Sequence, residues 1–435
     1  MRIYQTIIEK ADQIAPALIA QRRDFHKHAE AGWTEMRTSS IIARKLTELG
    51  YEVLVGEQVC KKDARMGVPS DEVLEAAYQR AIDQGADPEF VKATKGGMTG
   101  VIGILRCGEG PTVAMRFDID ALGVNESMDE DHLPAKEGFR SINAGVMHAC
   151  GHDGHAVSGL GVAAVLMQIK DQLHGTVKLI FQPSEEGVRG AKSIVAHGHL
   201  DDVDYLLGSH TTDVDAEGSD ITPGSYGSLA SFKYDVTFRG LAAHAGGSPH
   251  LGKNALLAAS SAVVNLYAIP RHGAGASRIN VGRLIAGSGR NVIADEAFME
   301  MEVRGDTTAI NEYMNEYAMR ILENTAAMYG CTVEIKLMGA AESLTSDLPL
   351  CQRIADVCAN NLGMKVSEAL SIKLGGSEDC SYMMNCVQSR GGQAAFMRTR
   401  SPLAAGGHNR KYDFDESYIP KAVKVFCAMA YDLMK

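Results

Sequence analysis

The chain has 435 residues, of which 45% are hydrophobic and 22% are charged, and this composition excludes a disordered or fibrous protein. There are 43 lysines and arginines against 54 aspartates and glutamates, so the net charge of −11 argues against nucleic acid as the main partner. No segment approaches the ~20 consecutive apolar residues that span a bilayer, so we expect no membrane partner either.

The N-terminus and the cysteines indicate a compartment. Residues 1–10 carry charged side chains where a secretory signal peptide needs an apolar core. The nine cysteines are an odd number, scattered from Cys60 to Cys427 without a repeating spacing, which suits reduced thiols better than a disulfide framework. The sequence therefore predicts a cytoplasmic protein.

The first predicted elements are those of an α/β domain. Residues 57–97 form a polar excursion, mostly helical in pattern, in which Ser70 opens a helix. Nearly continuous apolar runs follow at residues 100–105, 111–117, 176–181 and 204–208. Such runs are typical of strands buried on both faces, as in a parallel sheet that helices cover. Residues 156–170, rich in Ala, Gly, Val and Leu, predict a closely packed helix between them.

A second kind of pattern begins near residue 228. Its elements are strand 232–238, helix 254–266, strand 279–281, strand 299–304, helix 310–328 and strand 331–337. The first, third and fourth strands alternate strictly between apolar and polar residues, so each buries one face. The order βαββαβ predicts a ferredoxin-like α+β unit. Helical patterns at 346–361 and 418–434 follow, so we expect an α/β domain at 1–227 and 342–435, interrupted by an α+β insert at 228–341.

Residues of the types that commonly ligate metals lie at the ends of the predicted buried strands. Cys150 and His152 stand two residues apart on the turn that leads into the predicted helix. Glu185, Glu186 and His210 directly follow the last two apolar runs. Loops at the carboxyl ends of strands converge on one crevice of an open α/β sheet, so these side chains form a metal-ligand set with hard and soft members. Taken alone, the Cys-x-His pair also fits a cysteine packed in the core beside a histidine whose ring nitrogens are hydrogen-bonded within the protein.

The adjacent Glu185 and Glu186 suit two different tasks. Neighbouring side chains in a turn can point in different directions, so one carboxylate can bind a metal while the other faces a water beside it. A metal lowers the pKa of such a water toward ~7, and the second carboxylate can then act as a general base. Asp118 and Asp120 add carboxylates to the same edge of the sheet. Standing alone, the glutamate pair would also fit an exposed acidic loop.

Six segments carry a resemblance to a known family. They are Arg22–His28, Arg116–Leu122, His148–His155, Phe181–Gly187, Gly375–Asp379 and Ala405–His408. In this order, and over nearly the whole chain, they resemble the M20 peptidase/amidohydrolase family, in particular its branch of auxin-conjugate hydrolases, hippurate hydrolases and N-acyl-amino-acid deacylases. The resemblance implies a metal-bearing α/β domain with an inserted lid that dimerises, as a homodimer or as a heterodimer with a related subunit.

The resemblance also implies the roles of individual residues. The ligands of a two-metal centre would be Cys150, His152, Glu186, His210 and His408. Glu185 would be the general base, and His244 of the lid would stabilise the oxyanion in the partner's active site. Asn291 and Arg304 would hold the carboxylate of the substrate. Arg304 also fits an exposed charge at the end of a strand.

The sequence does not identify the metal, and it departs from the pattern of the family at two positions. A thiolate with imidazoles suits Zn²⁺, while carboxylates and histidines also allow Mn²⁺, Co²⁺ or Ni²⁺. Ala29 and Ala294 stand where members of the family usually have proline, and the second could shift the loop that carries Asn291.

The expected substrate is a small N-acyl or N-aroyl amino acid. The excursion at 57–97 is absent from the typical deacylase and resembles family members that hydrolyse p-aminobenzoyl-glutamate. The first expectation is therefore metal-dependent hydrolysis of that amide to p-aminobenzoate and glutamate. A broad N-acyl-amino-acid deacylase or dipeptidase is the alternative, and a catalytically silent subunit or binding module is a different class.

Overall fold

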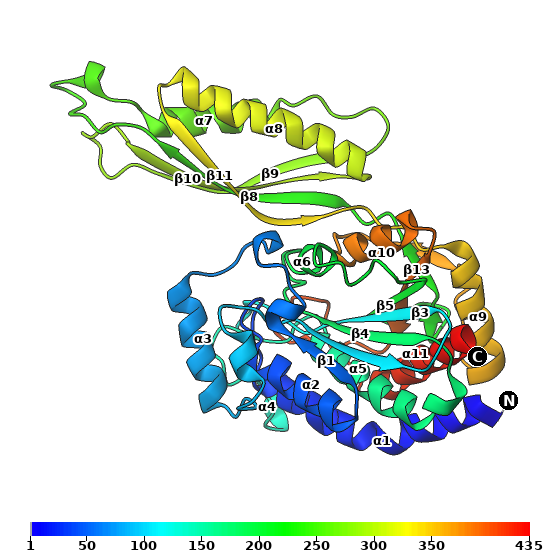
Figure 1. Cartoon of the computed structure of the whole chain (residues 1–435). Helices are drawn as coiled ribbons and strands as arrows, with labels where there is room; N and C mark the ends of the chain where they lie inside the picture. The colour runs from blue at the N-terminus through cyan, green and yellow to red at the C-terminus, as the bar shows by residue number, and fades with distance from the viewer. Residues whose placement is uncertain (1) are drawn as a thin grey trace. The chain divides into compact units, whose positions relative to one another are not determined.

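The computed structural model describes residues 2–435 and divides the chain into two compact units (Figure 1). The first unit comprises the chain up to Tyr226, Leu344–Lys373 and Asp379–Lys435. The inserted unit comprises Gly227–Ser343 and Leu374–Glu378. Within residues 2–435, none of the helices has the length and hydropathy that spanning a bilayer requires.

The first unit combines a central sheet with helices. Its helices are α1 (Arg2–Lys27), α2 (Met36–Glu48), α3 (Asp71–Asp83), α4 (Leu133–Lys136), α5 (His152–Gln168), α6 (Ala191–Val195), α9 (Leu348–Leu362), α10 (Cys380–Ser389) and α11 (Tyr418–Met434). Its strands are β1 (Glu52–Val55), β2 (Val101–Arg106), β3 (Thr112–Asp118), β4 (Thr176–Gln182), β5 (Tyr205–Thr212), β6 (Ile221–Thr222), β7 (Gly224–Tyr226), β12 (Ser371–Lys373) and β13 (Gln393–Arg400). The central sheet has the order β1-β2-β4-β3-β5-β13-β6, and β7 pairs with β12.

The central sheet is mixed, although the apolar runs predicted parallel strands. β3 is parallel to β4 and β5, and β5 is parallel to β13. β2 is instead antiparallel to both β1 and β4. Five of the six residues of β2 are buried, and α2 packs against this strand. Helices cover both faces of the sheet as a whole, with α5 and α11 on one face and α10 on the other (Figure 1). The continuous apolar run therefore reflects burial on both faces and carries no information on strand direction.

Residues 57–97 contain less α-helix than their pattern predicted. α3 begins after Ser70 as expected. The other turns are short 3-10 helices at Gly56–Gln58, Lys62–Ala64 and Val91–Thr94. Pro69 and Pro88 interrupt the pattern, because proline cannot donate a helical hydrogen bond. The excursion is anchored by Trp33, whose buried indole Nε1 donates to the carbonyl of Met66 at 2.7 Å.

The inserted unit has the predicted order of strands and helices. Its elements are β8 (Ala230–Arg239), α7 (Ala255–Tyr267), β9 (Ser277–Ala286), β10 (Glu296–Gly305), α8 (Thr308–Met328) and β11 (Thr332–Ala341). The strands form an antiparallel sheet in the order β11-β8-β10-β9. Every second residue of β10 is buried, and α7 and α8 pack against that face. The other face of the sheet, which we call the open face, is not covered by a helix of this unit (Figure 1).

A buried ionic network holds the first turn of α5 in place. Arg22 is fully buried, and its guanidinium donates to Asp153 at 2.8 Å and to Asp413 at 2.6 Å. His26 lies between two carboxylates, with Nδ1 2.8 Å from Asp153 and Nε2 2.9 Å from Glu126. Burial acts to lower the pKa of His26, but the hydrogen bonds to these carboxylates outweigh it and raise the pKa to about 9.

The free energy of unfolding should therefore fall as the pH rises through this range. The folded state holds the His26 proton more tightly than the unfolded chain, whose ordinary pKa is 6.5, so the stabilisation is present below pH 6.5 and is lost as the pH rises through about 9. The loss amounts to at most about 3 kcal/mol. Urea unfolding at a series of pH values, followed by the fluorescence of the single tryptophan, Trp33, measures it. His26→Gln should remove this contribution and the exposed His174→Gln should keep it, whereas an unchanged slope in His26→Gln would assign the effect to another group.

Candidate metal centre

Gly151 places Cys150 and His152 at the start of α5. Its φ of +87° lies in the left-handed region that glycine tolerates. A side chain would also collide there, since an added Cβ would lie 2.5 Å from Cγ2 of Thr211. The turn brings Sγ of Cys150 to 3.3 Å from Nε2 of His210, the residue that the sequence placed after a buried strand and that lies within β5.

The predicted ligands form two donor groups that share one thiol. The donor atoms of Cys150, His152 and His210, the first donor group, lie within 4.8 Å of one another. Those of Cys150, Glu186 and His408, the second donor group, do so too. Within the second group, Nε2 of His408 is 3.4 Å from Oε1 of Glu186. All five residues belong to the first unit, although they come from four separate stretches of sequence, so the structure brings together the complete predicted ligand set.

The ring orientations of the first donor group fit a bound cation. Nδ1 of His152 lies 2.9 Å from the carbonyl oxygen of Asp120, while its buried Nε2 has no hydrogen-bond partner. Nδ1 of His210 lies 2.6 Å from the carbonyl oxygen of Thr211, and its Nε2 faces Cys150. A carbonyl oxygen can only accept, so each Nδ1 carries a proton, and in the neutral ring Nε2 then offers a lone pair. Two imidazoles beside a thiol are a donor set that suits a divalent metal.

The surroundings of His152 also favour a positive charge. Burial alone lowers the pKa of His152, but Asp118, Asp120 and the neighbouring thiol raise it well above its usual value. A metal cation on Nε2 would meet the same negative surroundings that otherwise attract a proton. His210 differs, because burial and the nearby His155 keep its pKa well below the usual value. That ring therefore stays neutral, as a metal ligand must.

Asp120 fixes the turn that carries the two glutamates. Its Oδ1 accepts from the backbone N–H of Glu185 at 3.0 Å, and its Oδ2 accepts from that of Glu186 at 2.9 Å. Ser184, just before them, has a φ of +54°, an uncommon value for a residue with a side chain. Glu185 is largely buried, and its Oε2 lies 3.9 Å from Nε2 of His152. Its neighbour Glu186 contributes to the second donor group, and the donor atoms of both glutamates also lie within 4.8 Å of a nitrogen of His152.

Replacing Asp120 by asparagine should weaken metal binding without removing a metal ligand. The amide would set an N–H against the N–H of Glu185 or of Glu186, so the turn would lose one of its two acceptors. Loss of such a supporting contact typically costs about 10- to 100-fold in metal affinity. Titration of the metal-free variant against a competing chelator measures the change. Asp171→Asn, at an exposed carboxylate outside the site, should bind metal as the wild type does, and an unchanged affinity in Asp120→Asn would show that the turn does not depend on this contact.

A pocket of about 320 Å³ adjoins the donor groups and has room for a small molecule. It is lined in part by Cys150, His210 and His408, and also by Arg398 and Tyr412, which the sequence did not single out. Arg398 stands opposite His210 in the register of β13 and β5, so its position follows from a strand pairing. Its only signal in the sequence was an arginine directly after a short apolar run. Burial raises the pKa of the Tyr412 hydroxyl well above its usual value.

Two of the predicted lid residues are neighbours in the inserted unit. The N–H of Ala245, next to His244, donates to the carbonyl of Asn291 at 3.0 Å. Nδ1 of His244 accepts from the backbone N–H of Gly246 at 3.1 Å and from that of Gly247 at 3.0 Å. Because an accepting nitrogen carries no proton, the neutral ring has its proton on Nε2, which is then a hydrogen-bond donor.

Arg304, the third predicted lid residue, is held by an acidic neighbour on β10. Its Nε and Nη2 donate to the two carboxylate oxygens of Glu302, each at 2.8 Å. Such a bidentate pair fixes the plane of the guanidinium group. Arg304 is thus an oriented side chain rather than the freely exposed strand-end charge that its sequence context also allowed.

Comparison with known proteins identifies relatives over nearly the whole chain. The sequence model of Peptidase family M20/M25/M40 matches residues 114–432. The chain is similar to the indole-3-acetyl-aspartic acid hydrolase of Enterobacter agglomerans, with 46% identity over 96% of each protein. It is also similar to a subunit of the p-aminobenzoyl-glutamate hydrolase of Escherichia coli K12, with 44% identity over 98% of each protein.

Solved structures share the fold. An aminobenzoyl-glutamate utilization protein from Klebsiella pneumoniae has a TM-score of 0.83 and 39% identity, over 98% of this chain and 97% of that one. A dinuclear metal binding peptidase of the M20 family from Bacillus subtilis has a TM-score of 0.64 and 25% identity, over 97% and 99%. The region that the family model matches contains both donor groups and Glu185. The chain belongs to peptidase family M20/M25/M40.

Proposed function

We propose that this enzyme hydrolyses the amide bond between an aromatic acyl group and an acidic amino acid, with p-aminobenzoyl-glutamate as the first substrate. The observation that carries the proposal is the pair of donor groups that share Cys150, with the carboxylate of Glu185 beside them. The names of the two relatives support the substrate class, since one gives an aspartate conjugate and the other a glutamate conjugate. The products would be p-aminobenzoate and glutamate.

Two divalent cations would occupy the two donor groups, with Cys150 as the ligand that both groups share. Zinc and manganese suit this mixture of thiol, imidazole and carboxylate, and cobalt or nickel are also compatible with it. When bound, the ions would polarise the carbonyl of the substrate and lower the pKa of water in the site.

The side chains of the enzyme then move a proton and hold the substrate. The carboxylate of Glu185 takes a proton from the attacking water and passes it to the amide nitrogen as the C–N bond breaks, which releases the amino acid as a free amine. His244 of the partner chain donates from Nε2–H to the carbonyl oxygen as negative charge develops there. Arg304 holds the α-carboxylate, and Glu302 keeps the guanidinium group in place. Asn291 lies beyond the opposite end of β10, so in this proposal it reaches the same carboxylate from the partner chain.

The inserted unit is the proposed dimerisation surface. Exposed apolar side chains gather on α7 and on β9, namely Leu256, Leu257, Val264, Tyr267, Leu284 and Ile285. Apolar patches of this kind mark protein interfaces, and β9 is an edge strand whose backbone can pair with another chain. The partner would be a second copy of this chain or a related protein, and the relative from Escherichia coli is named as a subunit.

Val264→Asp should dissociate the proposed dimer. Val264 is 71% exposed on α7, so a charge there is harmless to the single chain but would be buried without a partner in the interface. Such a buried charge costs about 2–5 kcal/mol, enough to weaken association by roughly 30-fold or more. Sedimentation at micromolar concentrations measures the mass of the particle. Val73→Asp, on the exposed face of α3, is the matched control, and an unchanged mass in Val264→Asp would exclude α7 from the interface.

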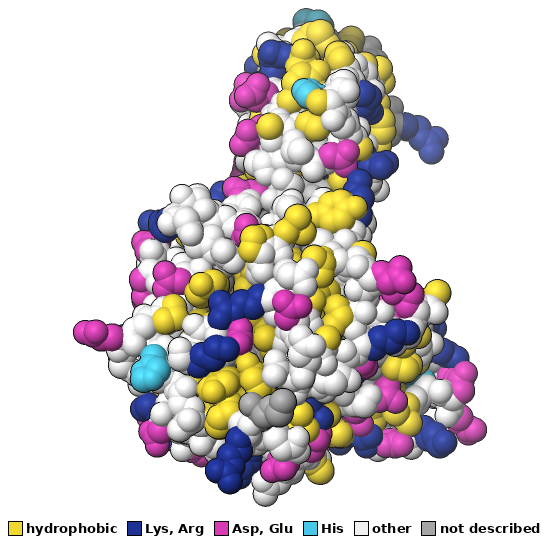
Figure 2. Space-filling model, turned by 90° about the vertical axis from the view of Figure 1, so that its right-hand side faces the viewer, with side chains coloured by type: hydrophobic (Ala, Val, Ile, Leu, Met, Phe, Trp, Pro, Cys, Tyr) yellow, Lys and Arg dark blue, Asp and Glu magenta, His cyan; other side chains and the backbone are white. Residues whose placement is uncertain are grey.

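A cytoplasmic location and a small-molecule substrate complete the proposal. All nine cysteines are free thiols, which suits a reducing compartment. Figure 2 shows a face on which acidic and basic side chains are interspersed, and the net charge of −11 leaves no basic excess for binding phosphates.

A substrate panel combined with metal analysis tests the proposed function. The purified protein, with its zinc and manganese content measured, is given p-aminobenzoyl-glutamate, indole-3-acetyl-aspartate, N-acetyl amino acids and dipeptides, and the released amine is quantified. We expect the aromatic conjugates of glutamate and aspartate to have the highest kcat/KM. Turnover confined to N-acetyl amino acids or dipeptides would establish a broad deacylase or dipeptidase instead. A fully metal-loaded protein that turns over none of them would indicate a silent subunit.

A further inference from the structure

The inserted unit contains a pocket of about 490 Å³, beside β9 and β10, whose charges do not cancel. Its polar lining consists of Arg271, Ser277, Arg278, Asn280, Glu302 and Arg304. Three guanidinium groups therefore face a single carboxylate. An excess of positive charge within a concave site concentrates anions, so the pocket suits an anionic ligand.

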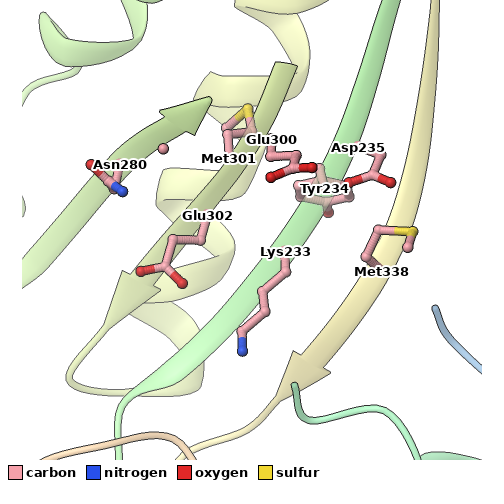
Figure 3. Close-up of a pocket in the computed structure, with 9 residues that line it drawn as sticks. Lys233, Tyr234, Asp235, Asn280, Glu300, Met301, Glu302 and Met338 are labelled. Carbon is pink, nitrogen blue, oxygen red and sulfur yellow. The ribbon is translucent and has the colours of Figure 1, made fainter. Parts of the chain in front are cut away.

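The strand register brings two of these arginines directly opposite each other. β9 and β10 are antiparallel, and Arg278 pairs with Arg304. Like charges in directly opposite positions destabilise a sheet, so an anion beside them would be favourable. On the next row of the open face, Glu302 pairs with Asn280 on one side and with Lys233 on the other, and Figure 3 shows the side chains of that row.

Glu302 neutralises the positive charge of only one of the three arginines. Both of its carboxylate oxygens accept from Arg304, at 2.8 Å each, so this acid is fully engaged with a single partner. Within residues 2–435, neither Arg271 nor Arg278 forms an ion pair, and both side chains are exposed. The pocket thus presents two guanidinium groups without a counter-charge beside a third that is already held in position.

We propose that Arg271 and Arg278 bind the side-chain carboxylate of an acidic amino acid whose α-carboxylate is held by Arg304. This inference rests on the proposed function and deepens it, because it names the residues that select aspartate and glutamate conjugates over conjugates of neutral amino acids. A guanidinium group binds a carboxylate through two parallel N–H···O bonds, so the arginines select for geometry as well as for charge. The volume of the pocket leaves room for the amino-acid half of such a conjugate.

The test compares two substrates that differ in one charge. The metal-loaded wild type and the Arg271→Ala/Arg278→Ala double variant are assayed with p-aminobenzoyl-glutamate and with p-aminobenzoyl-glutamine, which has nearly the same shape but a neutral side chain. We expect the double variant to lose roughly 10- to 100-fold in kcat/KM for the glutamate conjugate, the usual effect of losing hydrogen bonds to a charged group. Its kcat/KM for the glutamine conjugate should stay close to that of the wild type.

Arg283→Ala is the matched control, because Arg283 is also exposed on β9 but pairs with Glu300 and does not line the pocket. It should leave the ratio of the two kcat/KM values unchanged, and sedimentation should give the same particle mass for all variants. A double variant that keeps the wild-type ratio, or that slows both substrates equally, would overturn the inference.

A binding measurement separates this inference from the proposed function. Calorimetric titration with glutarate, a simple dicarboxylate, requires no turnover. If the wild type hydrolyses neither conjugate, the proposed function fails, and the titration alone then decides about the pocket. Binding that weakens by roughly 10-fold or more in the double variant would support the arginine pocket, whereas absent or unaltered binding would refute it.

Discussion

The Glu185→Gln variant should hydrolyse p-aminobenzoyl-glutamate roughly 10²- to 10⁴-fold more slowly than the wild type while it binds the same amount of metal. Glutamine keeps the shape of the side chain but cannot take a proton from water. The proposed mechanism makes Glu185 a base and not a ligand, although its Oε2 lies 3.9 Å from Nε2 of His152 and its carboxylate is also within 4.8 Å of that of Glu186. The metals should therefore remain bound while proton transfer fails. Steady-state kinetics and elemental analysis of the same preparation test both parts.

Two further variants make this result specific. Glu186→Gln removes a member of the second donor group, so it should lose metal as well as activity. Glu57→Gln, at an exposed position in the excursion, should change neither. Loss of metal from Glu185→Gln would make that residue a ligand instead of a base, and unchanged turnover would contradict the proposed mechanism.

Cys150→Ala should remove both metal ions. Cys150 is the one residue that both donor groups contain, so each group would be left with two donors. A metal contributes several kcal/mol of transition-state stabilisation, so turnover should fall by on the order of 10³-fold or more. Elemental analysis after dialysis should find metal close to zero per chain.

Comparing the metal content of Cys150→Ala with that of two other variants tests whether its thiol serves both donor groups. His210→Ala disables only the first donor group, so it should retain about half of the metal of the wild type. Cys107→Ala, at another half-buried free thiol, should retain all of it. If Cys150→Ala keeps one ion per chain, the thiol serves only one of the two groups.

The two kinds of sheet were predictable because burial leaves different periods in the sequence. The nearly continuous apolar run at 176–181 and the alternating residues at 299–304 are physically distinct signals, and they correspond to β4 and β10. Neither pattern indicates strand direction, so the sequence predicted parallel strands and missed the antiparallel pairing of β2. α1, which contains Pro16, and β13, a short run without a clear boundary, were also not predicted.

The site was predictable to the extent that its residues follow recognisable elements. Cys150 and His210 have buried strands or a packed helix next to them in sequence, whereas His408 lies in a glycine-flanked loop and was found only through the resemblance to the family. His408 has a φ of +65°, and its backbone N–H donates to the carbonyl of Ala149, which is distant in the sequence. The hydrogen bonds of Asp120 and the position of Arg398 also depend on long-range pairing, which no local spacing reveals.

The order of strands in the central sheet has a consequence for the growing chain on the ribosome. β13 lies between β5 and β6, yet β6 ends at Thr222 and β13 begins only at Gln393. Until that late segment emerges, the nascent chain has an unpaired edge on β5, which a chaperone can cover. The inserted unit can fold in the interval, since all but five of its residues are translated by Ser343. His408 follows β13, so the second donor group is completed only near the end of translation.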